Sequence, residues 1–188
     1  MNIVNVGYRS TNYYTIDIKD GKLLLDCGWP GTLPQLSAEC RRKGMALQDI
    51  KFLIVTHFHP DHAGLTQELK NLGTKLILPD CQIDCMPQLT EFFKTKTYPY
   101  VEIEQNDNLI LKIEESREFI SGLGIQGEIL HTPGHSHDSL TLILDEGFAF
   151  TGDLQPLFMI PQEDKVSRDS WDKIHKHKIK TIFPGHGK

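Results

Sequence analysis

The sequence predicts an α/β protein in which two sheets pack together and helices cover their outer faces. Short runs rich in β-branched and aromatic residues, which are typical of strands, recur in both halves of the chain. Segments with helical character separate these runs in each half, which places helices outside the two sheets. The chain of 188 residues shows no repeat, low-complexity linker or break in composition, so we expect a single domain over residues 1–188.

The expected elements follow from these patterns. Strands are expected at residues 2–6, 12–18, 22–26, 51–55, 74–78, 109–113, 119–121, 126–130, 139–144, 148–150 and 179–183. Helices are expected at residues 33–43, 63–71 and 167–177. Residues 81–94 have helical character but contain Pro87, which interrupts a helix, and residues 95–108 fit no regular element.

Composition and charge narrow the class of protein. The formal net charge of −5 argues against nucleic acid or an anionic membrane as a partner. The longest apolar runs have four residues, for example residues 52–55, whereas a membrane-spanning helix needs ~20. We find no signal-peptide pattern at the amino terminus. The four cysteines follow no disulfide pattern, and we therefore expect reduced thiols and a cytoplasmic protein.

One turn concentrates the residues that carry chemistry. Residues 56–62, Thr-His-Phe-His-Pro-Asp-His, lie between the expected strand at 51–55 and the expected helix at 63–71. His57 and His59 are two apart on extended backbone, so their side chains point the same way. Asp61 and His62 add two more ligands where the helix begins. Imidazole and carboxylate together suit a borderline divalent metal such as zinc.

Three later turns have the same design. His135 follows the expected strand at 126–130, Asp153 follows the strand at 148–150, and His186 follows the strand at 179–183. Each of these residues has a neighbouring glycine, which lets the backbone turn closely. A single His or Asp after a strand is usually a solvated loop residue, but the four turns together indicate a metal centre.

The ordered set His57-x-His59-x-Asp61-His62, His135, Asp153 and His186 resembles the metallo-β-lactamase superfamily, nearest to its glyoxalase-II-like hydrolases. The resemblance covers nearly the whole chain. It implies a four-layer αβ/βα sandwich of two mixed sheets, with two metal ions at one edge of the paired sheets. The commonest exported β-lactamases of this superfamily carry Cys where this chain has Asp153.

The resemblance also implies roles for the seven residues. His57, His59 and His135 would hold the first metal, Asp61, His62 and His186 the second, and Asp153 would bridge both. Two metals ~3.5–4 Å apart can share a water and lower its pKa toward about 7. Asp61 is the expected catalytic residue, which would orient this water and pass a proton. We expect two divalent ions, zinc first, with iron or manganese as alternatives.

Several other residues are weaker candidates for a role at the site. His137, Asp138 and Ser139 could orient His135 or Asp153, whereas His131 is expected to be structural. Cys81 and Cys85 are expected to pack in the interior, and the basic residues 173–180 to face solvent. The candidates for lining a substrate pocket are Tyr8, Tyr13, Trp29, Phe158 and Met159.

The expected activity is hydrolysis of an acyl bond (thioester, ester or lactone) in a small molecule. A mononuclear iron oxidoreductase of the persulfide dioxygenase type is one alternative, which the complete second ligand set disfavours. A phosphodiesterase is another, which two metals favour and the net charge does not. A non-catalytic binding module is a third. The substrate, the native metal, the oligomeric state and the role of residues 81–108 remain open at this stage.

Overall fold

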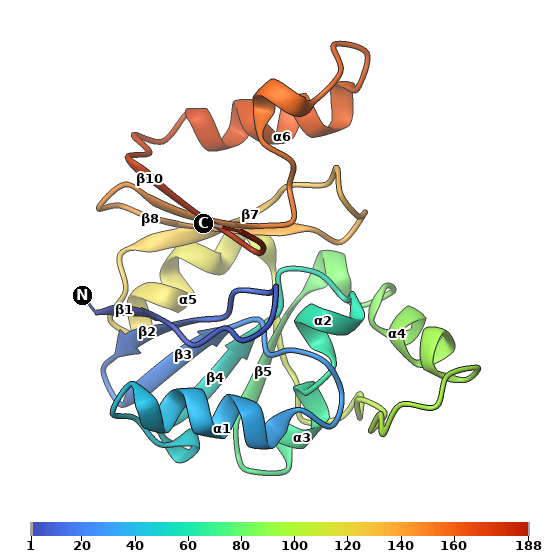
Figure 1. The fold of residues 1–188 in the computed structure, drawn as a ribbon. Coiled ribbons are helices and arrows are strands. Elements are labelled where there is room, and N and C mark those ends of the chain that lie inside the picture. Colours follow the sequence, from blue (N-terminus) through green and yellow to red (C-terminus); the bar gives the residue numbers. More distant parts are fainter. Residues whose placement is uncertain (1, 188) are drawn as a thin grey trace.

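A computed structural model describes residues 2–187 of the chain. Two sheets lie face to face with helices on both outer faces (Figure 1). The strands are β1 (Ile3–Asn5), β2 (Tyr14–Ile18), β3 (Gly21–Leu25), β4 (Ile50–Ile54), β5 (Lys75–Pro79), β6 (Leu109–Leu111), β7 (Gly127–His131), β8 (Leu140–Leu144), β9 (Phe148–Gly152) and β10 (Thr181–Pro184). The helices are α1 (Leu33–Arg42), α2 (Pro60–Ala63), α3 (Thr66–Lys70), α4 (Met86–Phe93), α5 (Ser116–Gly122) and α6 (Lys165–His175).

Both sheets are mixed. The six-stranded sheet has the order β1-β2-β3-β4-β5-β6, with antiparallel pairs up to β3 and parallel pairs after it. The four-stranded sheet has the order β10-β9-β8-β7, in which only β10 and β9 pair in parallel. The expected architecture, two mixed sheets with helices outside, is confirmed.

Alternation along the strands divides the apolar residues among three cores. In β3, Leu23 and Leu25 face the core between the sheets, whereas Leu24 faces the core under α1 and α3. In β8, Leu142 faces the core between the sheets and Ile143 the core under α6. Successive strand residues point to opposite faces, so continuously apolar strands are buried on both sides. This pattern produces the four layers.

The expected strand at residues 119–121 is wrong, because this segment belongs to helix α5. Ile120 is fully buried in the core between the sheets, and Phe119 and Leu123 pack against that core. Leu123 lies three residues after Ile120 and four after Phe119, so its side chain neighbours both of them on the helix. The Ser116 hydroxyl also anchors the first turn, since it donates to the carbonyl of Ile129 at 3.2 Å and accepts from its N–H at 3.1 Å.

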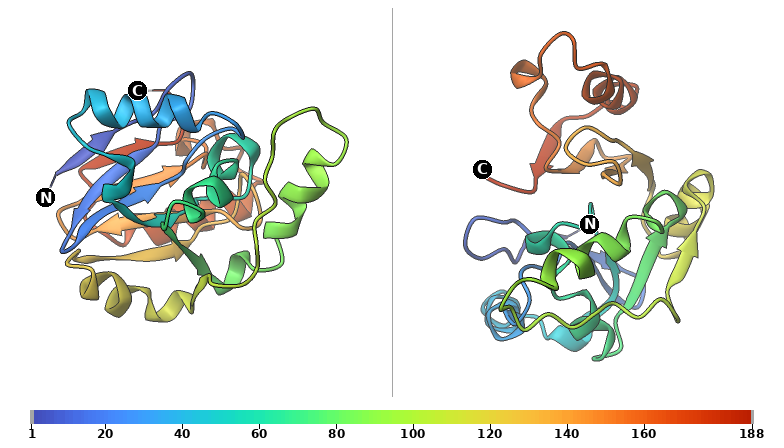
Figure 2. Two further views of the ribbon diagram at one scale, coloured as in Figure 1. Left: turned by 90° about the horizontal axis from the view of Figure 1, so that it is seen from below. Right: turned by 90° about the vertical axis from the view of Figure 1, so that its right-hand side faces the viewer.

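Two other helices differ from expectation in their bounds. The expected helix at 63–71 is two short helices, α2 and α3, and α2 begins early enough to include Asp61 and His62. The helix in residues 81–94 begins only at Met86, which puts Pro87 in the first turn, where a backbone N–H has no helical partner to lose. Figure 2 shows α4 and the segment after it projecting from one side of the sandwich. Between residues 2 and 187, no helix is long and apolar enough to cross a membrane.

Candidate metal centre

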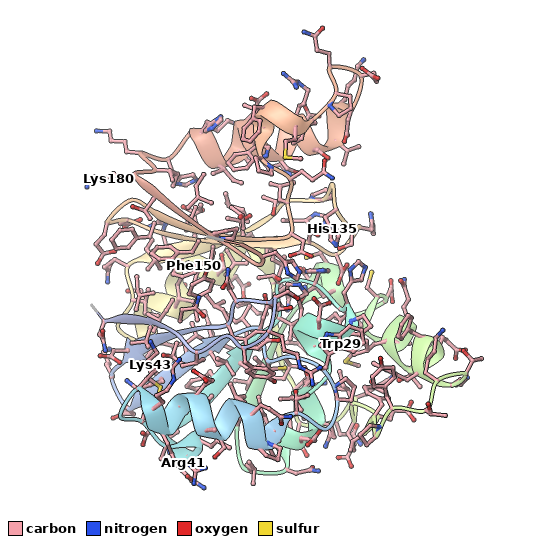
Figure 3. The ribbon with its side chains drawn as sticks, in the orientation of Figure 1. Trp29, Arg41, Lys43, His135, Phe150 and Lys180 are labelled. Atoms are coloured by element: carbon pink, nitrogen blue, oxygen red, sulfur yellow. The ribbon has the colours of Figure 1, made fainter. Side chains whose placement is uncertain are left out.

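The seven predicted ligand residues lie together at one end of the sandwich, just after strands of both sheets. Four of them follow β4, in the turn and in α2, and the others follow β7, β9 and β10. Figure 3 shows His135 at the end of the four-stranded sheet, near the level at which the two sheets meet. The set comprises His57, His59, Asp61, His62, His135, Asp153 and His186.

Their ligand atoms form three groups, and within each group all the atoms lie within 4.8 Å of one another. The groups are His57, His59 and His135; His57, His62 and Asp153; and Asp61, His62 and His186. The first and third groups match the two metal sets that the resemblance implies. The second group connects them, because it shares one histidine with each.

Asp153 lies between the two outer groups. Its Oδ2 is 3.9 Å from Nε2 of His57, 3.6 Å from Nε2 of His135 and 3.3 Å from Nε2 of His186. Its Oδ1 is 3.3 Å from Nε2 of His62. One carboxylate therefore faces four imidazoles drawn from both groups, which is the position required of a bridging ligand.

Buried polar atoms without partners show that these residues fit metal ions. Nε2 of His57, Nε2 of His62 and Oδ1 of Asp153 are buried and make no hydrogen bond to any described residue. Each unsatisfied group of this kind costs ~1–3 kcal/mol, so three of them side by side require an explanation. Coordination would satisfy all three, because imidazole nitrogen and carboxylate oxygen are ordinary zinc ligands.

The two buried imidazoles have opposite protonation tendencies. Burial, together with repulsion from the neighbouring imidazoles, holds the pKa of His57 well below its usual range. Burial also acts to lower the pKa of His62, but the carboxylates of Asp26 and Asp153 outweigh it and raise that pKa to about 10. The imidazole of His57 is thus neutral and can bind a metal without losing a proton. The imidazole of His62 would have to release a proton before it binds a metal.

Asp26, at the end of β3, is a functional residue that the sequence analysis missed. Its side chain is almost fully buried and its φ is +59°, a conformation uncommon outside glycine. His62 donates from Nδ1 to Oδ2 of Asp26 at 2.8 Å, which directs Nε2 toward Asp61 and Asp153. Thr56 donates its N–H to Oδ1 at 2.7 Å and its hydroxyl to Oδ2 at 2.8 Å.

Two glycines let the ligand turns approach one another. A Cβ on Gly185 would lie 2.4 Å from Oδ1 of Asp153 and 2.8 Å from Cε1 of His62. A Cβ on Gly152 would lie 2.6 Å from the hydroxyl oxygen of Thr56, and Gly152 has a φ of +52°. Both positions therefore require glycine. The expectation that glycines beside the ligands permit close turns is confirmed at these two positions.

The amino-terminal loop holds the turn that carries His186. Asn12 donates from Nδ2 to the carbonyls of Pro184 and Gly187, each at 3.0 Å. His186 donates from Nδ1 to the carbonyl of Ser10 at 2.8 Å, which leaves Nε2 free to face Asp61 and Asp153. The orientation of His186 thus depends on residues more than 170 positions away in the chain.

Residues near His135 have contacts that differ from the expectation. Ser139 accepts a hydrogen bond from the N–H of Ser136 at 3.2 Å and pairs with its hydroxyl at 2.7 Å, and so steadies the loop that carries His135. Asp138 does not contact His135. It accepts from the N–H of Phe58 at 2.7 Å and thereby fixes the backbone between the first two histidines.

The other flagged residues have structural contacts. His131 Nε2 donates to the carbonyl of His137 at 2.7 Å, and Lys173 donates to the carbonyl of His131 at 2.9 Å. Cys85 is buried and Cys81 is partly buried. Of the five residues proposed to line a substrate pocket, Met159 lines the hollow beside His135, Asp153 and His186. Phe158 is 88% exposed, and Trp29 stacks on Tyr98.

A pocket of ≈460 Å³ opens beside the candidate ligands. His135, Asp153 and His186 form part of its wall. The remainder comes from the end of β9 and the segment after it, from α6, and from β10 and the turn after it: Thr151, Gly152, Leu154, Gln155, Pro156, Met159, Trp171, Ile182, Pro184 and Gly187. This volume lies in the range of small-molecule sites, ~300–1,000 Å³.

Comparison with known families now settles the relationship. The family model of the metallo-β-lactamase superfamily matches residues 6–186. The chain belongs to this superfamily. Membership agrees with the ligand order and with the paired mixed sheets, and it implies divalent metal ions and hydrolytic chemistry in general terms.

Curated relatives extend over almost the whole chain at modest identity. A β-lactamase-like protein 2 homolog of Drosophila melanogaster is 29% identical over 95% of this chain, which spans 59% of that protein. A Methanocaldococcus jannaschii protein named "Probable metallo-hydrolase" is 29% identical over 96% of this chain and 89% of its own length. An N-acyl homoserine lactonase of Bacillus cereus is 27% identical over 70% of this chain. An atrochrysone carboxyl ACP thioesterase of Emericella nidulans is 24% identical over 95% of this chain.

Solved structures share the fold. A metallo-β-lactamase family protein from Thermus thermophilus superimposes with a TM-score of 0.74, at 22% identity, over 99% of this chain and 72% of its own. The subclass B3 metallo-β-lactamase of Bradyrhizobium japonicum gives a TM-score of 0.70 at 19% identity, over 98% of this chain and 75% of its own. At these identities the likeness concerns the fold.

Asp26→Asn is expected to lower zinc affinity by about 10- to 100-fold, the usual effect of losing a group that orients a metal histidine. In either orientation the amide nitrogen of Asn would face a donor, the Nδ1–H of His62 or the backbone N–H of Thr56. The measurement is zinc titration against a competing chelator. Asp17→Asn, which removes an exposed carboxylate on the same sheet, is the control and should leave the affinity unchanged. Equal affinities for the wild type and Asp26→Asn would contradict the orienting role.

Removal of metal with a chelator is expected to leave most of the fold intact, because a core of this size does not need metal. Amide exchange should nevertheless become faster from Phe183 onward, where a metal held by His186 would add to the Asn12 contacts that hold the chain. Asn12→Ala should accelerate exchange there even with zinc bound. Asn108→Ala is the matched control, since Asn108 also donates to two backbone carbonyls, those of Glu104 and Gln105. Identical exchange over residues 183–187 with and without zinc would show that His186 is not a ligand.

Proposed function

We propose that this chain is a binuclear metallohydrolase that cleaves the acyl bond of a small-molecule thioester, ester or lactone. The observation that carries the proposal is the position of Asp153, whose carboxylate lies within 4 Å of four imidazoles from two ligand groups. A single metal would need only His57, His59 and His135. The additional group of Asp61, His62 and His186 therefore supports two metals.

The metal we propose is zinc, with iron or manganese as the alternatives. Five imidazoles and two carboxylates form the ligand set, and this mixture suits a borderline divalent cation. His57, His59 and His135 would hold one ion, Asp61, His62 and His186 the other, and Asp153 would bridge them. When bound, such ions lower the pKa of water toward neutrality and polarise the substrate carbonyl.

The residues of the chain would then manage protons and position. Asp61 is the proposed catalytic residue, which accepts a proton from the attacking water and returns it to the leaving group. Thr11 donates to Oδ2 of Asp61 at 3.0 Å and so fixes the orientation of that carboxylate. The oxygen of water bonds to the acyl carbon and the bond to the leaving group breaks. The products are a carboxylic acid and a thiol or alcohol, or a single hydroxy acid where the substrate is a lactone.

Two findings favour acyl hydrolysis over the alternatives. The names of two relatives describe a lactonase and a thioesterase, both of which act on acyl bonds. The described residues that line the adjacent pocket include no Lys or Arg, which disfavours a phosphodiester substrate. The group of Asp61, His62 and His186 disfavours the mononuclear iron oxidoreductase, because an enzyme with one metal does not need it.

We also propose the branch of the superfamily, the cellular location and the classes of partner. The ligand pattern supports the glyoxalase-II-like branch. A cytoplasmic location follows from the four free cysteines, and the absence of nucleic-acid or membrane partners from the net charge of −5.

The proposed function is tested by purifying the protein without chelator and measuring metal content and hydrolysis in the same sample. We expect close to two zinc ions per chain and turnover of an ester, thioester or lactone, with no turnover of bis(p-nitrophenyl) phosphate. A stoichiometry of one or less after reconstitution with zinc or manganese would overturn the binuclear proposal. Turnover of the phosphodiester alone would overturn the acyl proposal.

Asp153→Ala is expected to abolish turnover and to weaken both metal sites together. Loss of a shared carboxylate removes a ligand from each ion and leaves their mutual repulsion less screened. The measurement is a zinc titration that resolves two binding steps. Asp145→Ala is the control, since Asp145 is an exposed carboxylate that pairs with Arg117 in the turn before β9, whereas Asp153 follows the other end of that strand. One site of undiminished affinity in Asp153→Ala would show that this residue does not bridge.

A further inference from the structure

The pocket beside the candidate ligands has a few polar lining residues and a larger apolar lining. His135, Asp153 and His186 lie in its wall, and Thr151 and Gln155 are its other polar residues. The larger side chains of the wall are apolar: Leu154, Pro156, Met159, Trp171, Ile182 and Pro184. A molecule that places a reacting group at the ligands therefore has apolar protein surface beside it.

We propose that this pocket binds the hydrocarbon chain of the acyl group, so that the substrates are esters, thioesters or lactones of medium- or long-chain carboxylic acids. This inference rests on the proposed function and names its substrate class. It identifies Met159, Ile182 and Trp171 as specificity-determining residues.

The exposure of two lining residues supports an apolar ligand. Met159 is 59% exposed and Ile182 is 45% exposed, although both are large apolar side chains. They lie in different parts of the chain, in the 3₁₀ turn Leu157–Met159 and in β10, and converge on one hollow. A hydrocarbon chain between them would remove apolar surface from water on both sides, which is the main source of affinity for such a ligand.

Trp171 contributes apolar surface and no free hydrogen-bond donor. Its Nε1 donates to the carbonyl of Gln155 at 2.8 Å, so the one polar atom of the indole is already satisfied. The side chain is also buried, which fixes it in the wall. A polar ligand would therefore gain nothing from this residue, whereas a methylene chain would gain contact.

The charge of the lining determines which half of the substrate enters. No described lining residue is Lys or Arg, so the pocket offers no counter-ion to a phosphorylated or carboxylated leaving group. The acyl chain of such a substrate carries no charge. The acyl chain is therefore the half of the substrate that can enter this pocket without the burial of an unpaired charge.

A second, smaller hollow lies beside the first. It has a volume of ≈210 Å³, and Trp171 and Ile182 line it as well as the first. His175 and Lys180 also line it, so its lining is mixed rather than apolar. The apolar ligand is therefore assigned to the first hollow alone.

The first test is a chain-length series of p-nitrophenyl esters, from acetate to decanoate, with zinc-loaded protein. We expect kcat/KM to rise about fourfold per added methylene over the middle of the series, the factor that burial of a methylene supplies. Ile182→Ser should flatten this rise. Ile110→Ser is the matched control, because Ile110 is also an exposed isoleucine on an edge strand, 58% exposed on β6, and should leave the rise unchanged. A flat wild-type series, or equal effects of the two variants, would overturn the proposal.

The second test does not depend on hydrolysis. The chain has two tryptophans, so Trp29→Phe leaves Trp171 as the only one, and its fluorescence reports on the pocket wall. We expect straight-chain 2-alkanones to change this emission with affinity that increases from butanone to decanone, and Ile182→Ser to reduce the increase. No dependence on chain length would overturn the pocket assignment. Affinity that falls as protein concentration rises would overturn it too, because a second copy of the chain would then fill the hollow.

The two tests separate this inference from the proposed function. Chain-length-dependent binding of ketones without hydrolysis of any ester would refute the acyl hydrolase while retaining the apolar pocket. Hydrolysis of esters with no chain-length dependence in either test would refute the pocket and retain the hydrolase.

Discussion

The cluster of imidazoles around the carboxylate of Asp153 is the constraint on which the rest of this structure depends. Within this cluster, Nε2 of His57, Nε2 of His62 and Oδ1 of Asp153 are buried and have no hydrogen-bond partner among the described residues. Such a cluster is unfavourable by itself, because buried polar groups need hydrogen bonds and like charges repel. The fold must therefore hold these side chains in place against that cost, and divalent cations are the partners that would remove it.

The sandwich supplies that support at the ends of its strands. Residues after β4, β7, β9 and β10 meet because both sheets present these strand ends on the same side of the molecule (Figure 1). The contacts that orient the ligands come from elsewhere in the chain: Asp26 from the end of β3, Asp138 from the loop before β8, and Asn12 from the loop before β2. Each contact fixes a backbone turn or one nitrogen of a ring, which leaves the other nitrogen for a metal.

The candidate ligands could be predicted from the sequence because each follows an apolar strand, and four of them lie within six residues. Asp26 could not, although it also follows a strand. It is 36 residues from His62, and a lone carboxylate after a strand carries no signal of its own. The only local indication is its left-handed backbone conformation, which the sequence does not reveal.

Errors in the predicted elements have a related cause. Residues 119–121 are apolar enough for a short strand, but their helix is determined by burial of Ile120 between the sheets and by the contact of Ser116 with β7. Both are tertiary contacts, and they override the local pattern. The pocket was missed for the same reason. Of the aromatic and Met residues considered from the sequence, Met159 lines it. Trp171 comes from α6, which carries no motif, and Ile182 is an ordinary apolar residue of β10, so neither residue had a signal of its own.

The position of the pocket would separate the proposed recognition of substrate from the proposed chemistry, but not completely. Met159 and Trp171 lie on elements that supply no candidate ligand, so changes there would alter what binds without moving the candidate ligands. β10 is different, because Ile182 lines the pocket and His186 follows only four residues later. A ligand that shifts β10 would therefore reach Asp153 through His186 and the Gly185 turn, where a single added Cβ would already lie 2.4 Å from Oδ1 of Asp153. We infer that selectivity can vary readily on the α6 side of the pocket, whereas the β10 side is constrained by the metal centre.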